Sequence, residues 1–477
     1  MGTTAAQRRD RIYVAGEWLD GDDTLSVTDL ADGGTFAEVT AASPEQARDA
    51  LAAAEEAKAA MRETTIVERA EWMHEIADGL EAREEELAEV IVREAGKPIS
   101  SARGEVDSAA TRFRRAAGEI RHMNGEYREG TTSGHEGWEA IVKHEPIGAV
   151  LCITPYNYPL ATTALQVAPA LAAGNAVVLK PASKTPIAAA ILAEVISEVD
   201  LPHDGAFNYV AGTASDVGDV LSGDDRVNAI AMTGSSGAGK HVAKESGMVN
   251  LHMELGGNAP EVVFPDADLD AAAAAATKGS LKYAGQRCSA VSRVLAHEDV
   301  HDEVVAKIDS QMDDWQIGDL FDPDTALGPL ISEDQAEWVQ ELVDDAVEKG
   351  ATLVRGGSHD GNFFEPTLLA DVPHDARVVH EEQFGPVAAV TTFESEADAL
   401  EVANGGDLAL DAAVFTADHD RAMRVANAID AGGVRINGAP SHGLGDIPFG
   451  GNKDSGIGRE GIDASIHAFV RKKSIIL

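Results

Sequence analysis

Cysteine is scarce in this chain, whose 477 residues contain only Cys152 and Cys288. Two cysteines so far apart do not form the disulfide framework of a small secreted protein. Their scarcity indicates a reducing compartment, and we therefore expect the protein in the cytoplasm. Cys152 lies in the apolar run 147–153, which is typical of a buried strand, so it is interpreted as a structural cysteine.

Basic residues are also few, with 38 Lys and Arg against 81 Asp and Glu and a net charge of −43. Such a charge opposes binding to nucleic-acid phosphates and to anionic membranes. The acidic residues are spread along the chain, which favours a solubilising coat, as in salt-adapted (halophilic) proteins, over a polyanionic surface for one partner. No apolar run reaches ~18 residues and no apolar signal core begins the chain, so neither a membrane span nor an anchor is expected.

What the sequence does contain is an alternation of strand and helix patterns. Helical periodicity fills 44–122, and a strand-like stretch at 126–146 could be an arm. From 147 short apolar runs alternate with helix patterns, and a second such series follows Gly257. The alternation predicts an α/β fold with a doubly wound parallel sheet, whose sites lie beyond the carboxyl ends of the strands.

Cys288 is the candidate nucleophile, and Glu254 is its candidate general base. A free thiol has a pKa of ~8.5 and needs a nearby base or positive dipole to react. Arg287, or a helix that begins within 288–292, could supply that field. Glu254 lies in an apolar stretch, so burial would raise its pKa, and the two glycines that follow allow a close backbone approach. Taken alone, each residue has a structural alternative: a buried cysteine and a salt-bridged carboxylate.

Two further polar residues follow or end predicted strands. Asn157, flanked by prolines, offers an amide to a developing oxyanion, and the alternative is an Asx-turn. Lys180 ends a buried strand, where its cation suits a ribose hydroxyl or a phosphate, and the alternative is a lysine that reaches solvent.

The stretch Gly234–Lys240 resembles a P-loop, which would make the chain an NTPase. However, His241 stands where a P-loop has the hydroxyl that binds Mg²⁺. The interpretation that remains is a strand followed by a helix N-terminus, with Gly234 and Ser235 facing a pyrophosphate. No metal cofactor is expected.

Eight stretches in order together resemble the aldehyde dehydrogenase superfamily. They are Thr154–Pro159, Gly174–Pro181, Thr233–Ser235, Glu254–Gly257, Gly285–Cys288, Gly328–Ile331, Glu381–Pro386 and Pro448–Glu460. The match spans nearly the whole chain, and it overturns the structural alternatives for Cys288, Glu254, Asn157 and Lys180.

The resemblance implies an enzyme that oxidises an aldehyde to a carboxylic acid with NAD(P)⁺. Cys288 would attack the aldehyde carbon to give a thiohemiacetal and then a thioester, while the Asn157 amide and the Cys288 N–H hold the oxyanion. Glu254 would activate the water that hydrolyses the thioester. Glu382 would grip the nicotinamide ribose, with Phe384 packed beside it.

The resemblance also implies three structural units. A Rossmann-type dinucleotide-binding domain would comprise 1–125 and 145–256, and an α/β catalytic domain would comprise 257–462. A small β oligomerisation element would comprise 126–144 and 463–477, so a homodimer or homotetramer is expected.

Two departures from the family pattern concern the ligands. Ser183 stands where many NAD-preferring members have a glutamate that bonds the adenosine ribose. Loss of that carboxylate removes repulsion against a 2′-phosphate near Lys180, so we expect NADP⁺ to be accepted and preferred over NAD⁺. The second departure is Arg287, because Gln-Arg-Cys resembles the non-phosphorylating glyceraldehyde-3-phosphate dehydrogenases.

The substrate mouth is expected to carry Arg287, Leu165, Ser289 and His442. The last three are not bulky aromatics, which favours a short polar or anionic aldehyde such as glyceraldehyde-3-phosphate, lactaldehyde or a semialdehyde. A CoA-acylating semialdehyde dehydrogenase is the nearest alternative, but the base Glu254 points to water as the acceptor. A non-catalytic acidic scaffold is the alternative from another class.

Overall fold

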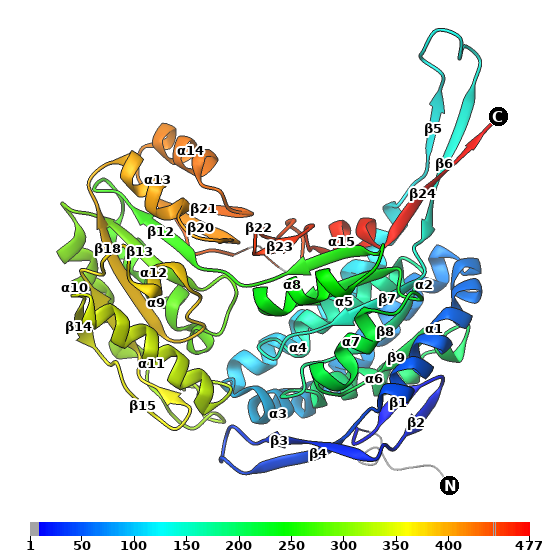
Figure 1. Ribbon diagram of the computed structural model, residues 1–477, viewed down its shortest axis with the longest axis horizontal. Helices are drawn as coiled ribbons and strands as arrows, with labels where there is room; N and C mark the ends of the chain where they lie inside the picture. The colour runs from blue at the N-terminus through cyan, green and yellow to red at the C-terminus, as the bar shows by residue number, and fades with distance from the viewer. Residues whose placement is uncertain (1–8, 442, 444) are drawn as a thin grey trace.

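The computed structural model describes residues 9–441, 443 and 445–477, and it has two lobes with a projecting arm (Figure 1). The segment of helical periodicity folds as four helices in the N-terminal lobe. They are α1 (Pro44–Glu63), α2 (Ile66–Glu81), α3 (Glu84–Ala95) and α4 (Ile99–Glu119). Each buries an apolar, alanine-containing stripe in one large core, as their periodicity predicts.

The N-terminal lobe is built on an eight-stranded sheet of order β2-β1-β9-β8-β7-β10-β11-β23. Its strands are β1 (Ile12–Val14), β2 (Glu17–Leu19), β7 (Ala149–Ile153), β8 (Ala176–Lys180), β9 (Phe207–Tyr209), β10 (Ala229–Thr233), β11 (Asn250–Glu254) and β23 (Gly456–Ile457). The five strands from β9 to β11 are parallel, as their short apolar runs predict. From β7 the chain adds β8 and β9 on one side and then β10 and β11 on the other. The strand order therefore reverses between β7 and β10, and doubly wound folds bind ligands at such a point.

The connections in this lobe are mostly helical. They comprise α5 (Ala161–Ala172), α6 (Ile187–Ser197), α7 (Asp219–Ser222) and α8 (Ser236–Glu245). The hairpin β3 (Asp23–Thr28) and β4 (Thr35–Ala41) runs along the outer side of the N-terminal lobe (Figure 1). The arrangement confirms the predicted α/β class.

The second lobe is a seven-stranded sheet of order β14-β17-β18-β13-β12-β20-β21, parallel except for β14. Its strands are β12 (Ala259–Val263), β13 (Val291–His297), β14 (Thr352–Arg355), β17 (Thr367–Ala370), β18 (Val387–Phe393), β20 (Asp411–Phe415) and β21 (Gly433–Ile436). One face packs on α9 (Leu269–Leu281) and α10 (His301–Gln311). The other packs on α11 (Glu333–Glu348), α13 (Glu396–Asn404) and α14 (His419–Ala428), next to the short α12 (Arg377–His380).

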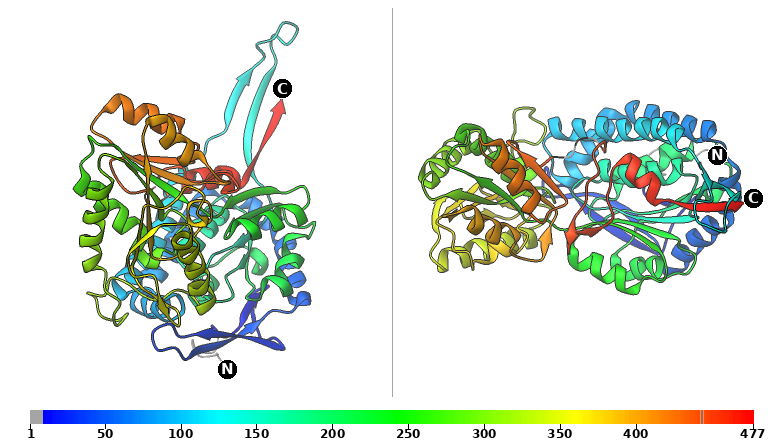
Figure 2. Two further views of the ribbon diagram at one scale, coloured as in Figure 1. Left: turned by 60° about the vertical axis from the view of Figure 1, so that its left-hand side comes forward. Right: turned by 90° about the horizontal axis from the view of Figure 1, so that it is seen from above.

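The arm is a three-stranded sheet of order β24-β6-β5 that stands clear of both lobes (Figures 1 and 2). It is formed by β5 (Glu126–Glu129), β6 (Glu139–Pro146) and β24 (Val470–Ile476), which follows α15 (Ile462–Ala468). The arm thus joins the segment 126–146 to a strand at the C-terminal end of the chain, and it has β5 and β24 as its edges.

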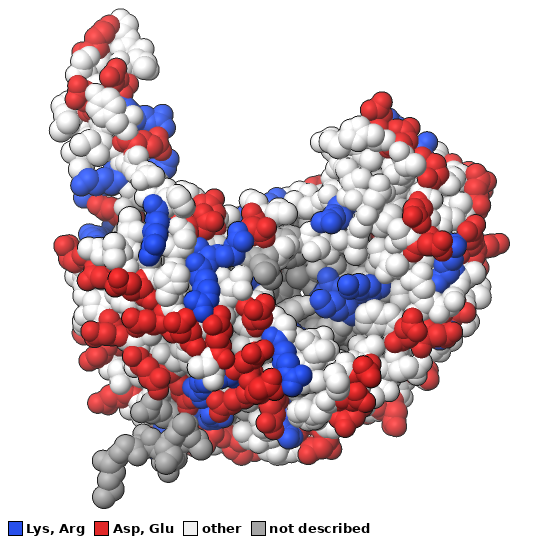
Figure 3. All heavy atoms as spheres, turned by 180° about the vertical axis from the view of Figure 1, so that it is seen from behind, with Lys and Arg blue, Asp and Glu red and all other residues white. Residues whose placement is uncertain are grey.

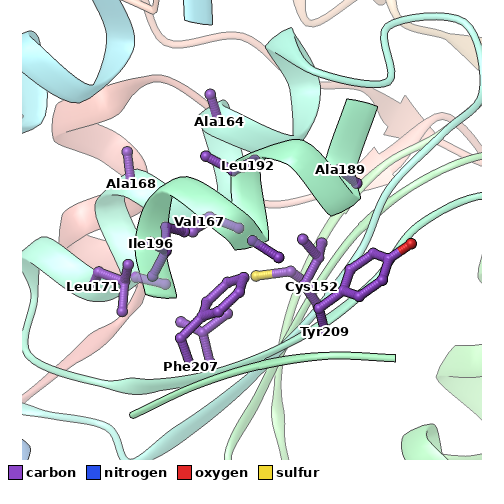
Figure 4. Close-up of a cluster of buried hydrophobic side chains, with 14 of the residues drawn as sticks. Cys152, Ala164, Val167, Ala168, Leu171, Ala189, Leu192, Ile196, Phe207 and Tyr209 are labelled. Carbon is purple, nitrogen blue, oxygen red and sulfur yellow. The ribbon is translucent and has the colours of Figure 1, made fainter. Parts of the chain in front are cut away.

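Cys152 lies on β7 and faces α5 and α6. Figure 4 shows its sulfur among apolar side chains that include Leu171 and Phe207. Burial raises the pKa of this thiol, which agrees with the interpretation as a structural cysteine. Within the described part of the chain, no helix is both long enough and apolar enough to cross a membrane.

Candidate active site

Four neighbouring strands of the first sheet end at one edge and bring the predicted polar residues together. Ile153, the last residue of β7, is paired with Lys180 at the end of β8, and Thr233 of β10 is paired with Glu254 of β11. The Gly234 N–H, just past β10, donates to the Glu254 carbonyl over 3.1 Å. The sequence-based placement at the carboxyl edge is therefore confirmed.

The loop that carries Cys288 has an unusual backbone. After α9 the residues Tyr283, Ala284 and Gly285 have φ values of 57°, 50° and 71°. A side chain on Gly285 would place its Cβ 1.9 Å from the Gly385 carbonyl oxygen, so only glycine fits there. This tight reversal delivers Cys288 to the gap between the lobes. The expectation of a helix within 288–292 is wrong, because Val291 begins the buried strand β13, and no helix dipole acts on the thiol.

Asn157 reaches this loop from the other lobe. Its Nδ2 donates to the Gln286 carbonyl oxygen over 2.8 Å, and Gln286 is itself fully buried. The Gln286 Oε1 accepts from the Ile331 N–H over 2.9 Å, which fixes the loop from behind. One of the two Asn157 amide hydrogens is thus used in placing the Cys288 loop, and the other is free for a ligand.

Gly257 and Glu254 confirm two expectations about the candidate base. A Cβ on Gly257 would lie 2.1 Å from the Cys288 carbonyl oxygen, so the glycine permits the predicted close approach. The Glu254 side chain is buried, and among the described residues neither carboxylate oxygen has a hydrogen-bond partner. Burial raises the pKa of Glu254 well above its ordinary value, and the nearby carboxylates Glu460 and Asp411 raise it further.

The thiol of Cys288 lies in the same environment and is half-buried. Burial raises its pKa well above the ordinary value, and the charges of Glu254, Asp411 and Glu382 add to that rise. Arg287 acts in the opposite direction. The thiolate therefore forms only when positive charge is added nearby or when the proton passes to a base.

The residues predicted to bind a cofactor lie along the edge of the first sheet and on the facing loop of the second lobe. The Ser235 side chain caps α8 by accepting from the Ala238 N–H, so the helix N-terminus points out of the sheet as predicted. Lys180 is buried, and its Nζ makes one long hydrogen bond, of 3.4 Å, to the Pro181 carbonyl. Burial lowers the pKa of Lys180 to about 8, while Ser183 lies half-exposed on the following loop.

Glu382 faces this edge from the second lobe. Its Oε1 accepts from the Gly257 N–H over 2.8 Å, and burial raises its pKa to about 7. Phe384 adopts φ 49°, and its ring packs edge-on against Tyr156 at 5.9 Å between centroids. A buried lysine with a single weak bond, a helix N-terminus and a carboxylate with a free oxygen are a donor and acceptor set that fits a dinucleotide.

The P-loop-like stretch does not present a free lysine. Lys240 is ion-paired with Asp454, and His241 Nε2 lies 2.7 Å from the Asp219 carboxylate. Both side chains are exposed on α8, away from the helix start. In the described residues no cluster of three or more His, Cys, Asp or Glu is placed to hold a metal ion.

A cavity of about 520 Å³ opens in front of Cys288 and Glu254. Leu165, Ser289 and Arg287 line it, as predicted for the substrate mouth. His442, the fourth predicted residue, lies outside the described residues. Sequence reasoning missed other lining residues, which come from α4, from the turn that follows α9 and from loops elsewhere in the chain: Lys97, Glu105, Arg112, Tyr158, Lys282 and Glu460.

Three cations converge on this cavity: Arg112, Lys282 and Arg287. Within the described residues none of them forms an ion pair, and Nε and Nη1 of Arg112 are buried without a hydrogen-bond partner. In the part of the chain that the structure describes, the Arg287 guanidinium donates to Ser289 Oγ alone, over 3.2 Å. In a chain with 81 acidic and 38 basic residues, the scarcity of basic residues was a signal that could have drawn attention to unpaired ones.

Comparison with known proteins gives consistent matches over the full length. The profile of the Aldehyde dehydrogenase family matches residues 18–475. A 3-sulfolactaldehyde dehydrogenase of Priestia aryabhattai is 36% identical over 98% of this chain and 97% of its own length. The succinate-semialdehyde dehydrogenase [NADP(+)] of Escherichia coli (strain K12) is 38% identical over 98% of this chain and 97% of its own length. The crystal structure of an NADP-dependent glyceraldehyde-3-phosphate dehydrogenase from Bacillus halodurans C-125, complexed with NADP, is 35% identical, with a TM-score of 0.96 and 98% coverage of both chains.

Proposed function

Since this chain belongs to the aldehyde dehydrogenase family, we propose that it oxidises a short aldehyde with an anionic group to the carboxylic acid, with NADP⁺ preferred over NAD⁺. The observation that carries the substrate class is the set of unpaired cations, Arg112, Lys282 and Arg287, around the cavity. A buried guanidinium without a partner is unfavourable, and an anionic substrate would satisfy it. The relatives named above act on aldehydes that carry a sulfonate, a carboxylate or a phosphate.

The surroundings of each residue support the catalytic role proposed for it. The Cys288 Sγ attacks the carbonyl carbon, and the proton of the thiol passes to a base within the buried site. The free Asn157 amide hydrogen and the Cys288 N–H donate to the oxyanion that develops on the former carbonyl oxygen. The Cys288–substrate bond survives the oxidation as a thioester.

When bound, the cofactor would supply a hydride acceptor and a positively charged ring. Glu382 would hold its nicotinamide ribose with Phe384 packed beside it, and Lys180, Ser183 and the helix start at Gly234 and Ser235 would hold its adenosine and phosphates. Lys180 is a buried cation with little else to bind, and Ser183 adds no negative charge, so a 2′-phosphate is accommodated.

Glu254 then acts on water. Its buried carboxylate has no hydrogen-bond partner among the described residues to compete for the proton, and its raised pKa makes it a stronger base. The hydroxide attacks the thioester carbon, the C–S bond breaks, and the carboxylate product leaves while Cys288 recovers a proton. A retained base of this kind favours hydrolysis over transfer of the acyl group to coenzyme A.

A panel of aldehydes with NADP⁺ tests the proposal. Glyceraldehyde-3-phosphate, succinate semialdehyde, lactaldehyde and benzaldehyde are compared by kcat/KM, and the products are checked for free acid and, with coenzyme A present, for acyl-CoA. We expect an anionic aldehyde to be preferred by about 10-fold or more, as charge-assisted hydrogen bonds predict. Equal or better turnover of the neutral aldehydes would overturn the substrate class, and acyl-CoA product would overturn the hydrolytic step.

We also propose that the arm is an oligomerisation element and that the protein is a cytoplasmic homodimer or homotetramer. The support is an arm that leaves the body, its unpaired edges, and the exposed apolar side chains Tyr127, Ile475 and Ile476 on them. The three units with bounds 1–125 plus 145–256, 257–462, and 126–144 plus 463–477 belong to the same proposal. Light scattering of the full chain and of a chain lacking 470–477 tests it, and a monomeric full chain would refute it.

A further inference from the structure

Lys97 is a buried cation in the wall of the cavity, between α3 and α4. Its side chain is 2% exposed and is ion-paired with Glu105. Its Nζ also lies over two aromatic rings, 3.5 Å from the centroid of Tyr158 and 4.4 Å from that of Tyr283. An ammonium over an aromatic face is attracted by the ring quadrupole, and the attraction grows when water is excluded.

Glu105 connects this cation to the loop that carries Asn157. Its Oε1 accepts from the Leu160 and Ala161 N–H groups, over 3.0 Å each. These are the first N–H groups of α5, a helix whose own N-cap residue makes no side-chain hydrogen bond. A carboxylate from α4 therefore caps the helix that starts four residues after Asn157.

Tyr283 connects the same cation to the loop that carries Cys288. It is the first of the three left-handed residues, and its hydroxyl donates to the Ala95 carbonyl over 2.7 Å. A bulky residue at φ 57° is strained and persists only where its surroundings hold it. The Lys97 ammonium and Ala95 are those surroundings, and both belong to the α3–α4 junction.

We propose that Lys97 is a positioning residue that holds the Asn157 loop and the Cys288 loop in register. It touches neither the thiol nor the oxyanion, and it acts through Tyr158 and Glu105 on one loop and through Tyr283 on the other. The proposal rests on the roles proposed for Cys288 and Asn157. A neutral side chain of equal length would fill the same space, but it would lose both ring contacts and leave Glu105 buried without its partner.

The charge state of Lys97 also separates it from the three substrate-facing cations. Lys97 is neutralised by Glu105 inside the wall, whereas Arg112, Lys282 and Arg287 have no ion pair among the described residues. Lys97 is therefore expected to affect neutral and anionic aldehydes alike, while a substrate-binding cation affects mainly the anionic ones.

The test compares Lys97→Met with Arg83→Met as a matched control. Arg83 makes a similar pair, 2.5 Å long, with the buried Glu194 at the α3–α6 contact, and neither residue lines the active-site cavity. For Lys97→Met we expect kcat to fall about 10- to 100-fold with both an anionic and a neutral aldehyde, as misplacement of reacting groups by about 1 Å predicts. The KM for NADP⁺ should stay within about 2-fold, whereas Arg83→Met should lower Tm but keep kcat within about 2-fold.

A double-mutant cycle with Asn157→Ala distinguishes positioning from general destabilisation. If Lys97 acts by placing Asn157 against the Cys288 loop, Lys97→Met should lower kcat less in the Asn157→Ala background than in the unmodified enzyme. The loss of kcat in the double variant is then smaller than the product of the losses in the two single variants. Losses that multiply, a loss confined to the KM of the anionic aldehyde, or an equal kcat loss in Arg83→Met would each overturn the proposal.

If Lys97→Met does not fold, Glu105→Gln replaces it and is expected to give the same non-multiplying kcat loss. Cys288→Ala is assayed alongside to tell the two failures apart: activity retained in Cys288→Ala would refute the proposed function, on which the role of Lys97 rests, whereas the outcomes named above with an inactive Cys288→Ala would refute the role of Lys97 alone.

Discussion

Basic side chains have different surroundings on the outer surface and in the cavity. On the surface, Arg114 donates to Asp78 and Glu81, Arg103 donates to Glu85, and Asp and Glu cover much of the face shown in Figure 3. In the cavity, Arg112 is on the same helix as Arg114, two residues earlier, and has buried nitrogens without a partner. On the outer surface the abundant carboxylates pair with the cations. In the cavity the cations named above have no such pair among the described residues, so they are available to a ligand.

The two cysteines differ in the same way, because one lies among apolar side chains and the other lies beside the polar groups of the cavity. Burial raises the pKa of both thiols. Cys152 is surrounded by apolar side chains of α5 and α6, whereas Cys288 shares its cavity with Glu254 and with the loop bonded to Asn157. Burial alone therefore does not distinguish a structural thiol from a reactive one, and the polar groups within reach do.

The largest effect is expected from replacing the nucleophile. Cys288→Ala should lower kcat by about 10⁴-fold or more, because no other group can form the thioester. Cys152→Ala is the matched control, and it should keep kcat within about 2-fold while lowering Tm. Initial rates and thermal melts of both variants measure this, and a comparable loss in Cys152→Ala would break the distinction between the two cysteines.

Replacing the base should separate the two halves of the reaction. Glu254→Gln should slow turnover by about 10²- to 10³-fold while the first-turnover burst of reduced cofactor remains. In the unmodified enzyme the active form is the carboxylate, and its pKa is raised by burial. The deacylation rate should therefore fall as the pH drops through that raised pKa. Stopped-flow absorbance across pH measures both, and loss of the burst in Glu254→Gln would instead assign the residue to the first step.

Arg112 and Arg114 offer the sharpest contrast between cavity and surface. Arg112→Met should lower kcat/KM for an anionic aldehyde by about 10- to 100-fold, the worth of a buried charge-assisted hydrogen bond, and should spare a neutral aldehyde. Arg114→Met removes exposed pairs that are worth about 0–1 kcal/mol and should leave both values within about 2-fold. Equal losses on the two aldehydes would mean that Arg112 supports the fold and not the substrate.

Much of the first sheet could be predicted because buried parallel strands are short apolar runs. Lys180 could be placed at a strand end for the same reason, and it ends β8. The strand that Glu254 ends, β11, was not predicted. The backbone before Cys288 could not be predicted, because the left-handed Tyr283 depends on contacts with Lys97 and Ala95, which are remote in sequence. The helix considered at 288–292 as an alternative to Arg287 is absent from the structure, because Val291 already begins β13.

Arg112 could not be recognised from sequence either. On an amphipathic helix an arginine that points into a cavity and one that points to solvent have the same local signature, and Arg112 and Arg114 are only two positions apart. Which of them faces the cavity is decided by the packing of α4 against α2 and α5. The sequence shows that basic residues are scarce, but it does not show which of their side chains point into the cavity.

A smaller effect is expected at the adenosine end of the cofactor site. Ser183→Glu should shift the ratio of kcat/KM for NADP⁺ over NAD⁺ by about 10-fold or more towards NAD⁺, because the new carboxylate repels a 2′-phosphate. Ser183→Gln adds similar bulk without charge and should shift the ratio much less. Steady-state rates with both cofactors measure this, and a strong NAD⁺ preference in the unmodified enzyme would already refute the proposed preference.

The smallest of these effects is expected from added salt, which should raise the thermal stability by acting on the surface charges and lower kcat/KM for an anionic aldehyde by acting on the cavity charges. With a net charge of −43, like-charge repulsion outweighs the exposed ion pairs, so screening it should raise Tm by a few degrees between ~0.1 and ~1 M KCl, where the Debye length falls from ~10 to ~3 Å. Screening also weakens long-range attraction between the cavity cations and an anionic aldehyde, so kcat/KM for that substrate should fall about 2-fold or more while that for a neutral aldehyde stays constant. Chloride is used because sulfate stabilises proteins by exclusion and would obscure the screening. A Tm that falls with KCl would mean that the surface pairs, and not the repulsion, dominate outside the cavity.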